Sequence, residues 1–251
     1  RRGEKDITDI QIMQSRGGLT AQIVAKLFQD TVKGVKGVKE KIEAMYLQAI
    51  STGSTLVEDA DNVGTAIRVS FGYKEENKHT AAIKWGSSGY KPMSDIERIK
   101  DNSDVDYTTI MLSKAAYNLL INSQEAKELA AQSVGLVVLP TSVLPTPLKS
   151  AFNAAFEAKT GMSIIVVDKN VKIEKNGVRH TIKPFDQSAV VFLTSTTVGR
   201  LVWGTLAEKA NPVAGVSYED YDSFILLSKY SKNDPLQEFT SAQALAIPII
   251  D

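Results

Sequence analysis

The longest run of helical periodicity lies near the start of the chain. Apolar side chains recur every three or four residues over residues 19–51, which predicts one long amphipathic helix. At 1.5 Å per residue, this helix would be about 50 Å long. Gly53 provides a stop signal just beyond it, whereas Gly34 and Gly37 inside it suggest a bend or a close contact. A shorter helical turn is predicted at residues 7–14.

Period-two alternation then predicts an antiparallel hairpin. Apolar residues alternate with small or polar ones over residues 66–73 and again over residues 81–85, as in half-buried strands. The polar run at residues 75–78 supplies the turn between them. Ser94 and Glu97 have the spacing of a capping box, which predicts a short helix ending near residue 100.

The second half of the chain alternates between helical and strand signals. Ser113 is predicted to cap a helix that ends near residue 132, and Thr146-Pro147 to open another that stops at Gly161. Asn176-Gly177 predicts a tight hairpin turn, because both residues tolerate positive φ. Residues 164–167 are continuously apolar, as in a strand buried on both faces. Further strands are predicted at residues 107–112, 134–139, 189–193, 201–203, 224–230 and 244–250.

These elements predict an α+β fold. Helices and strands are mixed, but they lack the regular βαβ alternation of a doubly wound nucleotide-binding sheet. The chain has 251 residues, which fits one large domain or two intertwined ones.

Composition removes several classes of function. The chain has 29 basic and 29 acidic side chains, whereas a dedicated nucleic-acid binder usually has a clear basic excess. It has no cysteine, which excludes disulfides, thiolate nucleophiles and cysteine-ligated zinc. No apolar run approaches the roughly 20 residues that span a bilayer. The chain begins at Arg1 without an initiator methionine, so we expect a fragment, a processed product or a trimmed chain.

Candidate chemistry is sparse. The two histidines, His79 and His180, have no partner at ligand spacing, so no metal site is expected. Phosphate-binding loops and nucleophile elbows do not occur. The paired carboxylates Glu75-Glu76 and Glu219-Asp220 fall in predicted turns, and the hydroxyl-rich residues 194–197 are interpreted as a loop. We therefore expect no catalytic residue, no cofactor-binding residue and no metal ligand.

A series of short motifs resembles the lambda-like major capsid proteins of tailed bacteriophages, the major capsid protein E family. The resemblance extends from about residue 6 to residue 250 and rests on the order and spacing of the motifs. They are Ile12-Met13-Gln14, Val69-Ser70-Phe71-Gly72, Glu75-Glu76-Asn77, Trp85, Pro92-Met93-Ser94-Asp95-Ile96, Thr109-Ile110-Met111-Leu112-Ser113, Asn176-Gly177, Gly199-Arg200-Leu201-Val202-Trp203-Gly204, Asp234-Pro235 and Glu238-Phe239-Thr240.

The resemblance implies the Hong Kong 97-like capsid fold, with a spine helix and β-sheet in a peripheral domain and a second, axial domain. Residues 1–103 would form the peripheral domain, residues 104–205 the axial domain, and residues 206–251 would return to the peripheral domain. The N-terminal arm and the extended loop of that fold are expected to be missing here. The chain would then be a soluble core, which could be monomeric.

The implied function is structural. A phage or prophage head protein self-assembles into capsomers and an icosahedral shell around double-stranded DNA, in the virion capsid, after assembly in the host bacterial cytoplasm. The implied partners are other copies of the chain, packaged DNA bound non-specifically, and scaffold, portal and decoration proteins, with no membrane and no enzymatic activity. The alternatives are an encapsulin-like nanocompartment shell and an α+β enzyme or small-molecule-binding domain.

A cluster of lysines on the predicted long helix has two interpretations. It is a solvated face partly neutralised by glutamates, or it is a surface that faces packaged DNA or an acidic neighbouring subunit. The lysines are Lys33, Lys36, Lys39 and Lys41, and the glutamates are Glu40 and Glu43.

Overall fold

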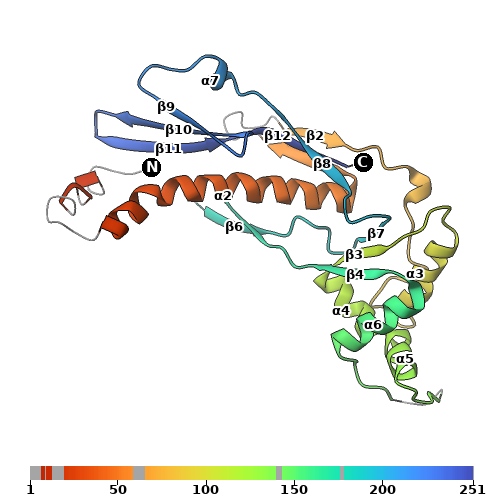
Figure 1. Ribbon diagram of the computed structural model, residues 1–251. Coiled ribbons are helices and arrows are strands. Elements are labelled where there is room, and N and C mark those ends of the chain that lie inside the picture. Colours follow the sequence, from red (N-terminus) through yellow and green to blue (C-terminus); the bar gives the residue numbers. More distant parts are fainter. Residues whose placement is uncertain are drawn as a thin grey trace. The chain divides into compact units, whose positions relative to one another are not determined.

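The computed structural model describes residues 7–8, 10–12, 20–58, 66–139, 143–175 and 178–250. The chain divides into two compact units. Unit 1 comprises Arg1–Ala44 and Arg200–Ile249, and unit 2 comprises Met45–Gly199 and Ile250–Asp251. The long helix α2 (Thr20–Thr52) begins in unit 1 and ends in unit 2 (Figure 1). This helix confirms the prediction from periodicity. Residues 7–8 and 10–12 are helical as predicted, and the rest of that helical turn lies outside the described residues.

Unit 1 combines the first part of α2 with a set of strands. The strands are β8 (Gly199–Gly204), β9 (Ser217–Tyr221), β10 (Ile225–Lys232), β11 (Gln237–Gln243) and β12 (Leu245–Ile250), and the short helix α7 (Ala207–Ala210) lies between β8 and β9. β10 is the middle strand of an antiparallel sheet in the order β11-β10-β9, and β12 pairs with β8. The strands predicted near residues 201, 224 and 244 are thus confirmed as β8, β10 and β12, whereas β9 and β11 were not predicted.

Helix α2 packs on this sheet through a small apolar cluster. Val35 is buried with Ile225 and Leu227 of β10. A Cβ added at Gly34 would lie 3.0 Å from the Cβ of Ala242 in β11, which is closer than side chains normally approach. The glycine therefore allows helix and strand to come together, which is the close contact suggested by its place in the sequence. No atom lies within 4 Å of a Cβ added at Gly37, so this explanation applies to Gly34 alone.

Unit 2 is built around a mixed three-stranded sheet in the order β4-β3-β7. β3 (Thr109–Ser113) runs parallel to β4 (Ser163–Val167) and antiparallel to β7 (Val190–Leu193). The connection from β3 to β4 contains helices α4 (Lys114–Asn122), α5 (Gln124–Ser133) and α6 (Lys149–Thr160), and α3 (Pro92–Asp101) precedes β3. Two antiparallel hairpins complete the unit: β1 (Ser54–Glu58) with β2 (Ala66–Ser70), and β5 (Val171–Lys175) with β6 (Val178–Ile182).

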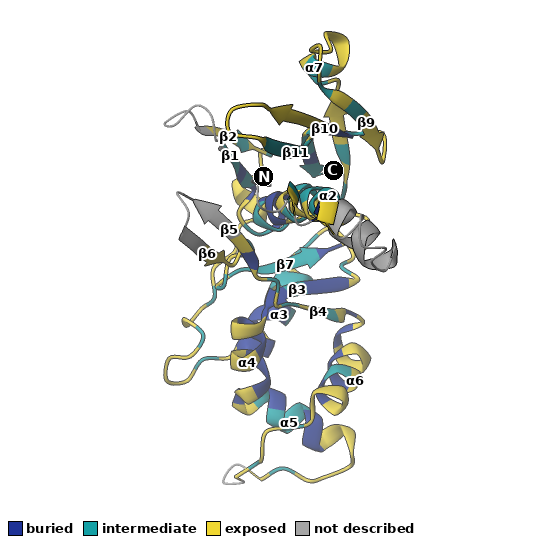
Figure 2. Ribbon diagram, turned by 90° about the vertical axis from the view of Figure 1, so that its left-hand side faces the viewer, coloured by how far each residue is buried: buried dark blue, intermediate teal, exposed yellow. Residues whose placement is uncertain are grey.

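The core of unit 2 lies between the sheet and these helices (Figure 2). The rings of Tyr117, Phe152 and Phe156 are almost fully buried and contact one another edge-on or tilted, at centroid distances of 6.0 to 6.3 Å. The helical spacing of Phe152 and Phe156 places both on one face of α6. The other buried members are Met93, Ile96, Ile110, Leu112, Ala116, Leu120, Ile121, Ala126 and Met162.

In unit 2, the predicted N-terminal cap of one helix and the predicted C-terminal stop of another are confirmed. The Ser113 hydroxyl oxygen accepts a hydrogen bond from the Ala116 backbone N–H at 3.0 Å and caps α4. Gly161 ends α6 in the left-handed conformation, with φ of 74°. The helix predicted to run from residue 113 to 132 is interrupted, however, because Ser123 is extended and caps α5 by accepting from Ala126 N–H.

The predicted hairpin around residues 75–78 is wrong. β2 pairs with β1, with Ser54 opposite Ser70, and residues 81–85 form no strand. The predicted turn is a single 3-10 turn, Glu75–Asn77. The alternation of apolar residues over residues 81–85 does not reflect strand pairing. The Ala82 backbone N–H and the Trp85 indole N–H donate instead to the carboxylate of Asp95.

Other predictions need correction as well. Residues 134–139 form no strand, and β4 is not buried on both faces, because Ile165 and Val166 are exposed at the sheet edge. Helix α6 begins at Lys149 rather than at Pro147. The turn Asn176-Gly177 lies outside the described residues, although its flanking strands pair as predicted.

Candidate assembly surface

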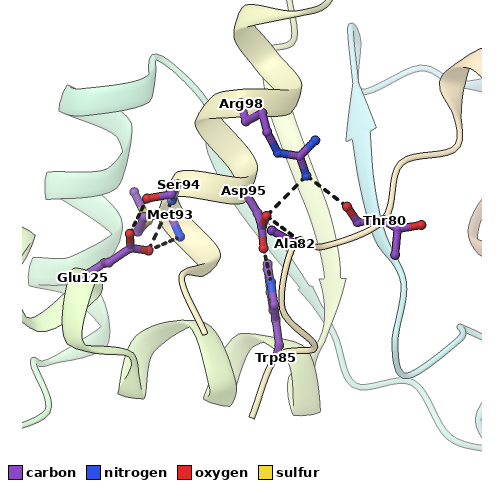
Figure 3. A network of polar contacts seen from close by, with 8 residues as sticks. All are labelled: Thr80, Ala82, Trp85, Met93, Ser94, Asp95, Arg98 and Glu125. Carbon is purple, nitrogen blue, oxygen red and sulfur yellow. Dashed lines mark hydrogen bonds and ion pairs between the residues drawn. The ribbon is translucent and has the colours of Figure 1, made fainter. Parts of the chain in front are cut away.

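The carboxylate of Asp95 fixes the chain that leads into α3 (Figure 3). It is buried at the first turn of the helix and accepts hydrogen bonds from Ala82 N–H at 3.0 Å and from the Trp85 indole N–H at 3.1 Å. Arg98, one turn later, pairs with it at 3.3 Å and donates to the Thr80 carbonyl at 3.0 Å. All these contacts hold the loop against the helix, so we assign this carboxylate a structural role.

Glu125 of α5 caps the start of α3 (Figure 3). Its carboxylate accepts from the backbone N–H of Met93 at 2.8 Å and of Ser94 at 3.2 Å, and the Ser94 hydroxyl donates to its other oxygen. These N–H groups have no acceptor within the helix, and the carboxylate of Glu125 supplies one. Its negative charge also interacts favourably with the positive N-terminal end of the helix dipole. The predicted capping box is therefore wrong: α3 begins at Pro92, Ser94 lies inside it, and Glu97 pairs with Lys159 at 2.8 Å.

An exposed apolar segment without charged residues lies between α5 and α6. We call residues 134–139 and 143–148 the uncharged segment. Within unit 2 it lies at the end remote from the sheet β4-β3-β7 (Figures 1 and 2). Val137 is 88% exposed and Val143 is 98% exposed. Val134, Leu136, Leu139 and Leu148 are also exposed large aliphatic residues.

Backbone and side-chain hydrogen bonds attach the uncharged segment to the helices. The Leu136 N–H donates to the Ala131 carbonyl at 3.0 Å, and the Gly135 N–H donates to Gln132 at 2.9 Å, with Gly135 at a φ of 78°. At the other end, the Thr146 hydroxyl donates to the Asn122 side chain at 2.8 Å. The segment therefore starts and ends on fixed points of unit 2, while its six aliphatic side chains named above are exposed to solvent.

The lysines of α2 are partly neutralised in unit 1. Lys39 pairs with Asp222 in the β9–β10 turn, where Asp222 and Ser223 have positive φ, and its ammonium lies 5.1 Å from the centre of the Tyr221 ring. The hydrogen bond that the Lys39 ammonium donates to the Asp222 carboxylate raises the pKa of Lys39 above its ordinary value. Lys36 lies 3.8 Å from Glu40 on the same helix. This pairing supports the solvated-face interpretation over a DNA-facing surface.

The residues considered for chemistry are not brought together. His79 and His180 are both exposed, and within the described ranges no group of three or more His, Cys, Asp or Glu side chains could hold a metal ion. Residues 194–197 form an exposed loop, as interpreted from the sequence. Glu219 and Asp220 lie in strand β9 rather than in a turn, and Asp220 pairs with Lys209 at 2.7 Å.

One shallow depression in unit 1 offers no convergent chemistry. Its polar lining includes Lys209 and Asp220, whose charges neutralise each other. A ligand site would need polar groups that point at a shared position and remain available to it. In the described part of the chain, no helix is long and apolar enough to cross a membrane.

An exposed apolar segment held on fixed helices is a feature of a subunit that associates with other chains. The family model for phage major capsid protein E matches residues 3–249. The chain belongs to this family, and its role is structural, as a capsid protein of the virion. None of the curated proteins matches it.

Proposed function

We propose that the chain is a subunit of a closed icosahedral shell that encloses double-stranded DNA in a phage or prophage head. The match of the capsid family to residues 3–249 carries this proposal. The long helix α2 supports it, because 33 residues at 1.5 Å each would form a spine of about 50 Å. The fold would then be Hong Kong 97-like, with α2 and the sheet β11-β10-β9 in the peripheral domain.

We further propose that residues 104–205 form the axial domain and that residues 1–103 and 206–251 form the peripheral domain. The sheet β4-β3-β7 and helices α4, α5 and α6 lie in the axial range and share one core, which supports the first assignment. Met93 and Ile96 of α3 belong to the same core. Helix α3 would therefore be part of the axial domain, although it precedes residue 104 in the sequence.

Shell assembly would depend on many modest contacts rather than on one strong site. Symmetry repeats each contact in every subunit, and multivalency makes weak contacts effective. Scaffold, portal and decoration proteins would be the partners in the head, and assembly would take place in the host bacterial cytoplasm.

Electron microscopy of the full-length protein, expressed with its neighbouring genes, tests the proposal. We expect closed icosahedral shells or capsomer rings that contain nuclease-protected DNA once packaging proteins are present. Shells filled with an enzyme cargo instead of DNA would support a nanocompartment. Discrete monomers under all assembly conditions would refute the shell function.

A further inference from the structure

The sheet β4-β3-β7 has an acidic segment at one end. β3 and β4 run parallel and in register, so both strands begin at this end and finish at the opposite one (Figure 1). The chain that enters β3 contains three exposed aspartates, Asp101, Asp104 and Asp106, which we call the acidic edge. Within the described ranges, no ion pair involves any of the three. Lys100 is the one cation of residues 100–108, and its ammonium donates to the Thr160 carbonyl at 2.6 Å.

The opposite end of the same sheet carries lysines. Lys114 follows β3 directly as the first residue of α4, and its ammonium lies 2.6 Å from the carboxylate of Asp168, which follows β4. Helix α6 is joined to the start of β4 by residues 161–162 alone, so it runs back along the sheet and its first residue, Lys149, lies toward this end. The Lys149 ammonium is 5.9 Å from the centre of the Tyr117 ring in the first turn of α4, which agrees with that position.

A third lysine reaches this end from the other side of the sheet. β7 is antiparallel to β3, so the chain that enters β7 arrives where β3 finishes. There the Lys183 ammonium donates to the Gln187 side-chain oxygen at 3.5 Å, and the Gln187 carbonyl accepts from the Ser113 hydroxyl at 2.7 Å. We call the three lysines at this end the basic edge: Lys114, Lys149 and Lys183.

The basic edge keeps a net positive charge. The hydrogen bond from Lys114 lowers the pKa of Asp168, and the charges of Lys183 and Lys149 lower it further, because all three ammonium groups lie near this carboxylate. One carboxylate among three ammonium groups leaves an excess of positive charge. Helices α4 and α6 both begin here without an acidic residue in the first turn, where such residues are favourable. This departure from the usual charge preference is expected where a partner supplies the negative charge.

The two edges complement each other but cannot meet within one chain. The five residues of β3 separate them, which at about 3.3 Å per residue is roughly 17 Å. A nucleic acid would complement the basic edge alone, whereas a second copy of the chain complements both edges. Two different surfaces that fit each other give a head-to-tail contact, and repeated head-to-tail contacts form a ring when the rotation between subunits closes.

We propose that the basic edge of one subunit contacts the acidic edge of the next subunit, as a head-to-tail electrostatic contact within a capsomer. This inference rests on the proposed shell function, and it adds which two surfaces meet and by which charges. Because the side chains of both edges are exposed, the contact should weaken with salt. The Debye length falls from about 10 Å at 0.1 M ionic strength to about 3 Å at 1 M.

Zero-length cross-linking of shells assembled from the full-length protein tests the contact. A carbodiimide joins an amine to a carboxylate as an amide only where the two groups already meet, and mass spectrometry of the digested shells identifies the linked residues. The pair of Lys114 and Asp168, at 2.6 Å within one subunit, is the internal positive control. We expect links from Lys149 or Lys183 to the acidic edge in shells, and none in unassembled subunits.

The outcomes separate the contact from the shell function. Shells that give the link between Lys114 and Asp168 but no link between the two edges would overturn the inference while leaving the shell function intact. Links from the basic edge to a scaffold protein, a decoration protein or another surface of the subunit, in place of the acidic edge, would overturn it as well. Absence of shells in the unmodified protein would instead refute the proposed function.

Charge reversal tests the same contact without a reagent. Lys149→Glu combined with Lys183→Glu should lower the yield of shells at least about tenfold, because like charges would meet. Asp104→Lys combined with Asp106→Lys should lower it by a similar factor for the same reason. All four substitutions in one chain should restore most of the yield, because opposite charges then meet again. An unchanged Tm of each variant checks that the subunit still folds.

Lys84→Glu combined with Lys91→Glu is the matched control. Both lysines are exposed in unit 2 and belong to neither edge, so the same change of net charge should leave the yield unchanged. An equal loss of yield in this control, or no recovery in the fourfold variant, would overturn the inference. If the basic edge binds a nucleic acid instead, reversal of the acidic edge would not lower the yield, and the head-to-tail contact would be refuted.

Discussion

Unit 2 buries a continuous core of aromatic and aliphatic side chains, whereas among the described residues of unit 1 most apolar side chains are half exposed. In unit 2, Phe152 and Phe156 are 0% exposed within a large cluster. In unit 1, the described cluster consists of Val35, Ile225 and Leu227, with partly buried neighbours. Unit 2 thus gains its stability from side-chain packing, and unit 1, as far as its side chains are described, depends more on strand pairing and on the contacts between α2 and the sheet. This difference predicts that equivalent mutations in the two units change the free energy of unfolding by different amounts.

The largest effect is expected for Phe152→Ala in unit 2. Removing a fully buried ring leaves a cavity that the surrounding helices and sheet cannot close, which should lower the free energy of unfolding by about 3–5 kcal/mol. Urea denaturation followed by circular dichroism measures it. Leu148→Ala, at the start of the same helix but exposed, is the control and should change stability by less than about 0.5 kcal/mol. Equal effects of the two variants would contradict the packing of the unit 2 core.

A smaller effect is expected for Ile225→Ala in unit 1. This residue is buried in a smaller cluster that can relax, so we expect a loss of about 2–3 kcal/mol. The chain has two tryptophans, Trp85 in unit 2 and Trp203 in unit 1, and each can report on one unit.

Urea titrations of Ile225→Ala in Trp85→Phe and Trp203→Phe backgrounds separate the two units. The fluorescence transition of Trp203 should move to lower urea, and that of Trp85 should move less. Equal movement of both transitions would show that the units unfold together, and the comparison between them would no longer hold.

Loss of the Glu125 cap should have a moderate effect confined to unit 2. Glu125→Ala leaves the N–H groups of Met93 and Ser94 without their carboxylate partner, which should lower stability by about 1–2 kcal/mol. Glu128→Ala, one turn later on α5, removes only a contact with Gln124 and is the matched control. Thermal unfolding monitored at Trp85 would reveal the difference, and an equal change in both variants would argue against the cap.

The smallest expected change in stability comes from replacing either of two glycines of α2 by alanine. Gly37→Ala should stabilise the protein by up to about 1 kcal/mol, because the helix gains a better helix former and nothing lies near the new methyl group. Gly34→Ala should gain less or lose stability, because its methyl group would meet Ala242 in β11 at 3.0 Å. The Tm values of the two variants test this, and equal stabilisation would mean that helix and sheet do not approach closely at Gly34.

Local signals in the sequence predicted several elements correctly. The three- and four-residue spacing over α2, the capping by Ser113 and the left-handed end of α6 at Gly161 all depend on neighbouring residues. Such interactions are encoded within one or two turns of chain, and a single sequence is enough to recognise them.

Predictions failed where distant residues decide the structure. The alternation at residues 81–85 indicated a strand, but Asp95 takes the N–H groups of Ala82 and Trp85. The α3 cap comes from Glu125, which lies 31 residues from Ser94, and no local pattern points to it. The segment 134–139 has the composition of a strand but finds no partner strand among the described residues. Its apolar, uncharged character was visible in the sequence, whereas its exposure required the structure.

Strand β4 lies at an edge of its sheet and consists of Ser163, two isoleucines and two valines. Its second edge has no strand beside it in the described chain, and Ile165 and Val166 face solvent. Such an edge is a template for unwanted pairing with other chains. Asp168 and Lys169 follow at once, and Asp168 is held charged by Lys114, whose hydrogen bond lowers the pKa of Asp168. Charged residues that flank an apolar strand disfavour aggregation, and here they follow directly after the five residues of β4.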